Sequence, residues 1–332
     1  MSDPKVLDRI DEPSDLKQLD PDELVRLAQE IRQLMVKTVA RNGGHLAPNL
    51  GVVELTLALH LALDSPRDKI VWDVGHQAYV HKILTGRRGE FSTIRQRGGL
   101  SGFPRRSESP HDSFDTGHAS TSISVALGLA AGRDKNGTDE VVVAVIGDGA
   151  LTGGVAFEAL NQAGHLKTPL IVVLNDNNMS IGKNVGAMAS YLARIRFDPA
   201  YNRLKQEIEE RVKRIPGIGE KVAMVGHHLK EGIKHFLVPG GLFEELGFTY
   251  IGPIDGHDVG EVRRTIEWAK QYERPVLIHA VTEKGRGYGP AERKPEDFHG
   301  AAPFVVRTGS FKSAGRPPTY TNVFGDCLCR LA

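Results

Sequence analysis

Two short apolar runs, 141–146 and 170–174, constrain the fold of this chain more than any other feature. Each is long enough for a strand and apolar at every position, which indicates burial on both faces of a sheet. The segment between them, 155–164, has the composition of a helix, so the three pieces predict a parallel βαβ unit. We therefore expect an α/β fold in which helices flank a parallel sheet.

The rest of the pattern extends this unit. Helices are expected over 20–62, with a glycine-rich break at 41–46, and then over 120–131, 259–272 and 320–332; further strands are expected at 69–73, 248–251 and 275–281. Two segments stand apart. The polar connection 86–117 is long enough to be functional or disordered, and the charged excursion 184–240 is either a mobile lid or a pair of solvated amphipathic helices.

Composition narrows the function classes. The 42 Lys and Arg residues against 41 Asp and Glu residues leave a net charge of +1, which lacks the basic footprint of a nucleic-acid or membrane-surface binder. No apolar run is long enough to span a bilayer. Two cysteines, Cys327 and Cys329, cannot build a disulfide framework, so we expect a cytoplasmic protein.

Polar residues follow both strands of the βαβ unit. Gly147, Asp148 and Gly149 come after the first strand, and Asn177 comes shortly after the second. A glycine-rich turn here could be an ordinary tight turn or a dinucleotide-binding loop, but a carboxylate in the loop would repel a diphosphate unless a cation lay between them. Oxygen ligands from adjacent strand ends, with diphosphate oxygens, are typical of Mg²⁺.

These residues resemble the thiamine-diphosphate-binding signature of the transketolase-like enzymes. Six further segments make the chain similar to the 1-deoxy-D-xylulose-5-phosphate synthase family from about residue 10 to the end. They are 43–46 (GGHL), 72–79 (WDVGHQAY), 81–87 (HKILTGR), 98–103 (GGLSGF), 117–124 (GHASTSIS) and 250–258 (YIGPIDGHD).

The resemblance implies a division of the chain. Residues 1–305 would form the diphosphate-binding domain, 306–320 a linker, and 321–332 the start of a truncated pyrimidine-binding domain. The family's glutamate that activates the aminopyrimidine would lie in that second domain, so we expect these 332 residues alone to be inactive.

The resemblance also assigns roles to residues. Metal ligands would be Asp148, Asn177 and the Met179 carbonyl, while His45, His76 and His299 would act in catalysis. The implied contacts to thiamine diphosphate are His76, Gly117, His118, Ala119, Gly149, Ala150, Asn177 and Tyr288.

The implied reaction condenses pyruvate with D-glyceraldehyde 3-phosphate, with decarboxylation, to give 1-deoxy-D-xylulose 5-phosphate, a precursor of isoprenoids, thiamine and pyridoxal. A homodimer with thiamine diphosphate and Mg²⁺ is expected. The alternatives are the N-terminal subunit of a split transketolase-like enzyme, a non-catalytic cofactor-binding fragment, or a nicotinamide dehydrogenase, which would bind NAD without magnesium.

Several residues keep two interpretations. His81 is interpreted as a local hydrogen-bonding residue and His257 as a turn or capping element, rather than as catalysts. His118 could serve the pocket or stabilise its loop. Lys284 and Arg286 could form a phosphate-binding patch or a solvated basic loop.

Overall fold

The computed structural model describes residues 5–179, 181–182, 184–197, 241–312 and 318–332. Its centre is a five-stranded sheet in the order β1-β2-β3-β5-β4, in which all neighbouring strands are parallel. The strands are β1 (Lys69–Trp72), β2 (Val142–Gly147), β3 (Ile171–Asp176), β4 (Thr249–Asp255) and β5 (Val276–Val281). The predicted parallel sheet is confirmed.

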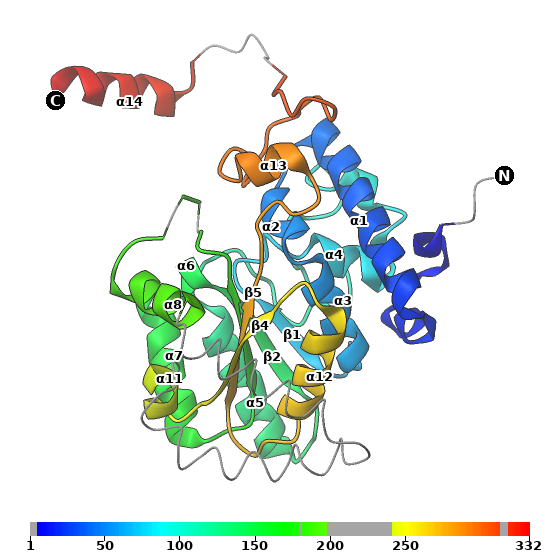
Figure 1. The fold of residues 1–332 in the computed structure, drawn as a ribbon, viewed down its shortest axis with the longest axis vertical. Helices are drawn as coiled ribbons and strands as arrows, with labels where there is room; N and C mark the ends of the chain where they lie inside the picture. The colour runs from blue at the N-terminus through cyan, green and yellow to red at the C-terminus, as the bar shows by residue number, and fades with distance from the viewer. Residues whose placement is uncertain (1–4, 180, 183, 198–240, 313–317) are drawn as a thin grey trace.

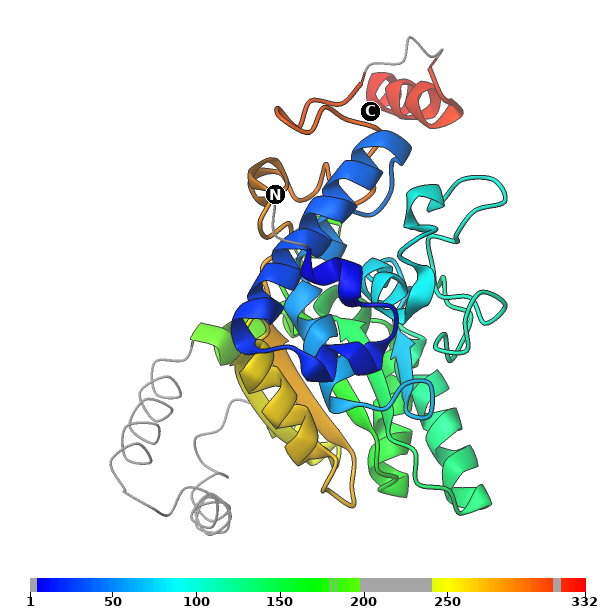
Figure 2. The same ribbon diagram turned by 90° about the vertical axis from the view of Figure 1, so that its right-hand side faces the viewer.

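Helices cover both faces of this sheet (Figures 1 and 2). The α-helices are α1 (Pro21–Asn42), α2 (Ala47–Leu50), α3 (Val53–Ala62), α4 (Tyr79–Lys82), α5 (Ser122–Asn136), α6 (Asp148–Leu151), α7 (Gly154–Leu166), α8 (Ala187–Phe197), α11 (Gly241–Glu245), α12 (Val259–Ala269), α13 (Gly289–Arg293) and α14 (Tyr320–Leu331). Shorter helical turns are η1 (Val6–Arg9), η2 (Pro13–Gln18), η3 (Ile83–Arg87) and η4 (Phe91–Thr93).

Strand periodicity divides the core into two layers. Alternate residues of β2 and β3, such as Ala144 and Val172, pack with α5 and α7, while Val143 and Val173 pack with α3 and α12. Because successive side chains of a strand point to opposite faces, a strand apolar at every position supplies both layers. A third apolar cluster joins α1 to the N-terminal turns.

Local signals set the helix boundaries. Asp20 caps α1 by accepting from the backbone N–H of Glu23 at 2.8 Å, and Gly43 ends it at φ 75°, a value that favours glycine. Helix α5 begins at Ser122, two residues later than predicted, because Ser120 adopts φ 70°. There the Asp73 carboxylate accepts the N–H groups of Ser120 and Ser122 at 2.8 and 3.0 Å.

The remaining segments compare with the expectations in different ways. The short helix α13, at Gly289–Arg293, lies outside the helices expected from the sequence. Helix α14 forms as predicted, with no buried residue, and lies apart from the sheet in both views. Most of the predicted 184–240 lid lies outside the described residues, and only α8 and its approach can be placed. Within the described ranges, no helix has both the length and the apolar character required to cross a membrane.

Candidate active site

The first part of the site is the carboxyl edge of the sheet, the upper end in Figure 1, where α6 follows β2. Gly147 pairs with Asn175 in register, so Asp148 and Asn177 leave adjacent strands, as predicted. One Asp148 oxygen, Oδ1, accepts the N–H of Gly149 at 2.8 Å. The Asn177 side chain accepts the N–H of Met179 at 3.1 Å, which closes the turn after β3.

The other Asp148 oxygen, Oδ2, fits a cation. It is buried and has no hydrogen-bond partner among the described residues. Burial, followed by the negative charge of Asp176, raises the pKa of Asp148 to about 7, and a bound cation would favour the ionised form. Within the described ranges no group of three or more His, Cys, Asp and Glu side chains could hold a metal by itself. Amide, carbonyl and ligand oxygens would have to complete the coordination, as is common for Mg²⁺.

The second part of the site is a cluster of three histidines from three separate segments. His45 follows α1, His76 follows β1 and His299 follows α13. Their ring centroids are 5.6 Å apart for His45 and His76, 5.8 Å for His45 and His299, and 5.2 Å for His76 and His299. The structure therefore brings the three predicted catalytic histidines together.

These histidines are neutral at physiological pH. Desolvation is the main cause that lowers the pKa of His45 to about 4, of His76 to about 3 and of His299 to about 4. The Nδ1 atoms of His76 and His299 are buried without a hydrogen-bond partner in the described part of the chain. A neutral imidazole has one donor and one acceptor nitrogen, so this cluster can orient a polar ligand and exchange protons with it.

Lys284 lies near both parts of the site. It is 6% exposed, and burial lowers its pKa to about 8, against the opposing charges of Asp148 and Glu296. Its own charge contributes to the lowered pKa values of His76 and His299. The solvated-loop interpretation is therefore wrong for Lys284. It holds better for Arg286, whose side chain is 44% exposed and lies 3.6 Å from Glu283.

Asn49 supports two of the histidines and was not singled out in the sequence. Its side chain is fully buried. The amide Nδ2 donates to the carbonyl oxygens of His45 and His76, both at 2.7 Å, and Oδ1 accepts the N–H of Tyr79 at 2.7 Å. One side chain thus fixes the segments that carry two of the three rings.

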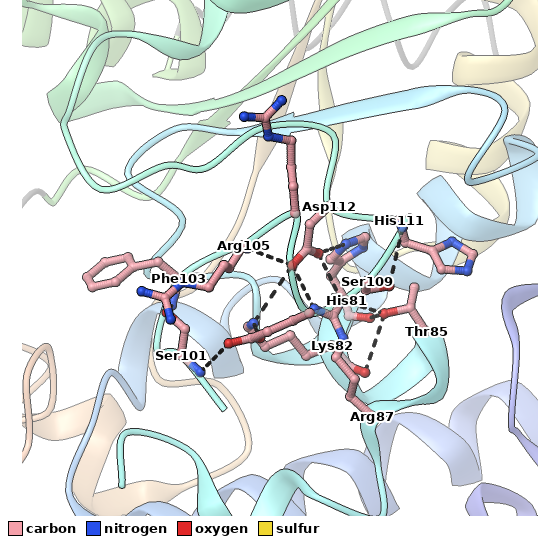
Figure 3. Close-up of polar contacts among 12 residues, drawn as sticks. His81, Lys82, Thr85, Arg87, Ser101, Phe103, Arg105, Ser109, His111 and Asp112 are labelled. Atoms are coloured by element: carbon pink, nitrogen blue, oxygen red, sulfur yellow. Dashed lines mark hydrogen bonds and ion pairs between the residues drawn. The ribbon is translucent and has the colours of Figure 1, made fainter. Parts of the chain in front are cut away.

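A buried polar network orders the 86–117 connection (Figure 3). Asp112 is its centre and accepts from His81 Nε2 at 3.0 Å, from Arg87 at 2.6 and 2.9 Å, and from the backbone N–H of Arg105 at 2.7 Å. The second nitrogen of His81 lies 2.9 Å from His60 Nε2. The expectation that His81 is a local hydrogen-bonding residue is confirmed.

The ordered connection supplies two neighbours of His45. The Phe103 ring lies 5.7 Å from the His45 ring, and Arg95 Nη1 lies 3.4 Å from His45 Nδ1. Neither residue was singled out in the sequence, because nothing in a polar loop indicates which of its side chains turns toward a distant histidine.

Other predicted contacts lie elsewhere or are open to solvent. The turn formed by Gly117, His118 and Ala119 is exposed. Tyr288 donates its hydroxyl to the Val306 carbonyl at 2.7 Å and packs against Phe298. It also lines a groove of about 1220 Å³ along α1 and α12, together with Arg286, whereas none of the predicted metal ligands or catalytic histidines lines it.

His257 has a structural role in the same region. Its backbone N–H donates to Asp255 at 2.8 Å, which confirms the predicted turn. Its ring lies 3.0 Å from Glu54 and accepts the N–H of Glu283 at 2.8 Å. It therefore ties the turn after β4 to α3 and to the segment that precedes Lys284.

Comparison with known proteins gives the family of this chain. The family model described as 1-deoxy-D-xylulose-5-phosphate synthase matches residues 7–282. The chain belongs to this family. The synthase of Desulfitobacterium hafniense (strain DSM 10664 / DCB-2) is 60% identical over 327 residues, which cover 98% of this chain and 52% of that protein. The synthase of Heliobacterium modesticaldum is 59% identical, over 99% of this chain and 51% of that protein. The chain thus spans about half the length of these synthases.

Solved structures give the same fold at lower identity. A transketolase from Campylobacter jejuni superimposes with a TM-score of 0.62 at 24% identity, over 85% of this chain and 41% of that one. A transketolase from Leishmania mexicana gives 0.58 at 21% identity, over 92% and 45%. These likenesses establish the transketolase-like fold for this member of the synthase family.

Proposed function

We propose that this chain provides the diphosphate and Mg²⁺ half of a thiamine-diphosphate site, in an enzyme that condenses pyruvate with D-glyceraldehyde 3-phosphate to 1-deoxy-D-xylulose 5-phosphate. The observation that carries the proposal is the buried, unpartnered Oδ2 of Asp148 beside the turn of Asn177 and Met179. Membership of the synthase family supports the choice of reaction. A homodimer and a cytoplasmic location belong to the same proposal.

Three ligands would hold the cation: the Asp148 carboxylate, the Asn177 side-chain oxygen and the Met179 carbonyl. Backbone N–H groups at Gly149 and Ala150 would contact the diphosphate, which the cation would join to the carboxylate. When bound, thiamine diphosphate supplies the electron sink that permits decarboxylation and carbon–carbon bond formation.

The histidines would handle substrate protons. Because His45, His76 and His299 are neutral near pH 7, each can donate one hydrogen bond and accept another without bringing a charge. The unpartnered Nδ1 atoms of His76 and His299 would face substrate oxygens. The Lys284 ammonium, near both the histidines and Asp148, would attract the anionic groups of substrate and cofactor.

A thermal scan tests the half-site. Mg²⁺ and thiamine diphosphate together should raise the melting temperature, and neither should do so well alone, because a ligand that binds only the folded chain stabilises it. Asp148→Ala should abolish the joint effect. Asp134→Ala, which removes a carboxylate bonded to Arg133 at the far end of α5, should preserve it. Equal protection in the presence of EDTA would refute the metal bridge.

A further inference from the structure

A second buried line of polar side chains ends at the turn that follows β3. His279, on β5, is fully buried. Its Nε2 lies 2.8 Å from Asp176 Oδ2, and its Nδ1 lies 2.7 Å from the hydroxyl of Tyr250 on β4. The line thus runs from β4 across β5 to β3 and reaches the residue immediately before Asn177.

The hydrogen positions follow from chemistry. When Asp176 is ionised and the imidazole is neutral, the ring hydrogen lies on Nε2 and points to the carboxylate, which only accepts. Nδ1 is then the acceptor, and the Tyr250 hydroxyl donates to it. Both nitrogens of the His279 ring therefore have a partner, and the two partners fix the orientation of the ring.

Asp176 connects His279 to the turn that follows β3. Its other oxygen, Oδ1, accepts the N–H of Asn178 at 3.1 Å. Thr282, the residue after β5, adds two bonds, because its hydroxyl donates to the Asn175 side chain at 2.5 Å and its N–H donates to the Asp176 carbonyl at 3.0 Å. The residues on both sides of Asn177 are thus held by named partners.

Tight packing supports the line from the far side. Tyr250 is 4% exposed and stacks on Phe243 at 5.9 Å. A Cβ atom at Gly252 would lie 2.6 Å from the His279 carbonyl and 3.0 Å from its Cβ, so the β4 backbone lies directly against this histidine.

We propose that Tyr250 and His279 are positioning residues that fix Asp176 and, through it, the turn carrying Asn177 and Met179 for Mg²⁺ binding. The inference rests on the proposed function for the identity of the metal. Partners behind metal ligands commonly change metal affinity by about 10–100-fold when they are removed.

Three variants test the proposal. Tyr250→Phe removes one hydroxyl. His279→Gln can retain a donor toward Asp176, and His279→Asn can retain only a group near the Nδ1 position. The matched control is His81→Asn, which removes an equally buried histidine from a different aspartate, Asp112.

Two measurements separate this inference from the proposed function. The first is amide hydrogen exchange at Asn178 and Met179 without metal or cofactor. Exchange should be faster in Tyr250→Phe and His279→Asn than in the wild-type chain and in His81→Asn. The second is the Mg²⁺ concentration that gives half-maximal thermal protection in excess thiamine diphosphate, which should rise about 10-fold or more in those two variants. His279→Gln should lie closer to the wild type.

The outcomes are distinct. An unchanged Mg²⁺ midpoint in both Tyr250→Phe and His279→Asn overturns the inference. If the wild-type chain shows no joint protection by Mg²⁺ and thiamine diphosphate, the proposed function fails, and exchange alone decides: faster exchange at Asn178 and Met179 supports the positioning role, and unchanged exchange refutes it. Tyr250→Phe keeps the test valid if the His279 variants do not fold.

Discussion

The side-chain amide of Asn49 donates a 2.7 Å hydrogen bond to the backbone carbonyl of His45, and the same nitrogen donates to His76. Together with Tyr79, whose hydroxyl accepts the N–H of His45 at 3.3 Å, this buried side chain sets the separation of the two segments. The distance between two of the three site histidines therefore depends on a residue that has no chemistry of its own.

Replacing Asn49 with Ala should destabilise the chain by about 3 kcal/mol, because two carbonyls and the Tyr79 N–H would lose their partner in the interior. Urea unfolding measures this loss. The matched control is Asn42→Ala, which removes bonds of 2.8 and 3.2 Å to Ser92 and Ile94 from the partly exposed end of α1. It should cost about 1 kcal/mol. Equal losses in both variants would contradict the role assigned to Asn49.

Stability should fall between about pH 6.5 and pH 4 because of the histidine cluster. In the folded chain the pKa values are about 4 for His45, about 3 for His76 and about 4 for His299, against 6.5 in the unfolded chain. In this window the unfolded state binds more protons, so the free energy of unfolding rises with pH. The free energy of unfolding reaches its full value above pH 6.5, where the histidines are neutral in both states.

Comparison with a variant isolates the cluster, since burial also lowers the pKa values of His60 and His111. The triple variant His45→Gln, His76→Gln, His299→Gln should lose less stability than the wild type between pH 7 and pH 5. Parallel curves of unfolding free energy against pH would show that these rings are not desolvated.

Much of the fold could be predicted from the sequence. The runs 141–146 and 170–174, which supply most of β2 and β3, are apolar at every position, and that pattern has few interpretations apart from a buried parallel sheet. Asp148 and Asn177 were predictable for the same reason, because the carboxyl ends of parallel strands share one edge. Each of these residues is placed by the strand that it directly follows, so the local pattern is enough.

The supporting network could not be predicted in this way. His279 lies within an apolar strand and Asp112 within a polar loop, and each finds its partner more than 20 residues away in sequence. Local pattern carries no information on such pairs. His60 and His279 therefore had no assigned role, although both are fully buried and hydrogen-bonded.

Asp112 should be essential for the order of the 86–117 connection. Asp112→Ala would leave His81 and Arg87 buried without their common partner, and we expect a loss of about 3–5 kcal/mol. Limited proteolysis should then cut first within this connection. The control is Asp115→Ala, since the Asp115 side chain is 57% exposed and should contribute under about 1 kcal/mol. An intact connection in Asp112→Ala would disprove the role of the network.

At Gly164, where the backbone of α7 packs closely against another segment, an added methyl group should lower stability. A Cβ atom there would lie 1.7 Å from the Leu246 carbonyl oxygen, so Gly164→Ala should force α7 away from the turn before β4. Overpacking of this kind costs about 1–3 kcal/mol.

Gly128→Ala is the matched control, in helix α5. It has nothing within 4 Å of the added methyl group, so it should stabilise the chain by about 0.5–1 kcal/mol. Thermal unfolding of both variants shows whether each substitution raises or lowers the stability of the chain. Stabilisation by Gly164→Ala would show that α7 and this turn are not in contact.

Catalysis by residues 1–332 alone should be undetectable, even with thiamine diphosphate and Mg²⁺ in excess. The curated relatives are about twice as long as this chain, and the family resemblance assigns the carboxylate that activates the aminopyrimidine to their remaining half. A general acid–base group contributes about 10²–10⁴-fold to rate, and an open pocket would lose further activity through solvation.

Release of carbon dioxide from pyruvate with glyceraldehyde 3-phosphate is the assay. Adding the second half of a relative, as a separate or fused chain, should restore turnover, and His45→Ala should then lower it. Robust product formation by the 332 residues alone would contradict this division of the active site.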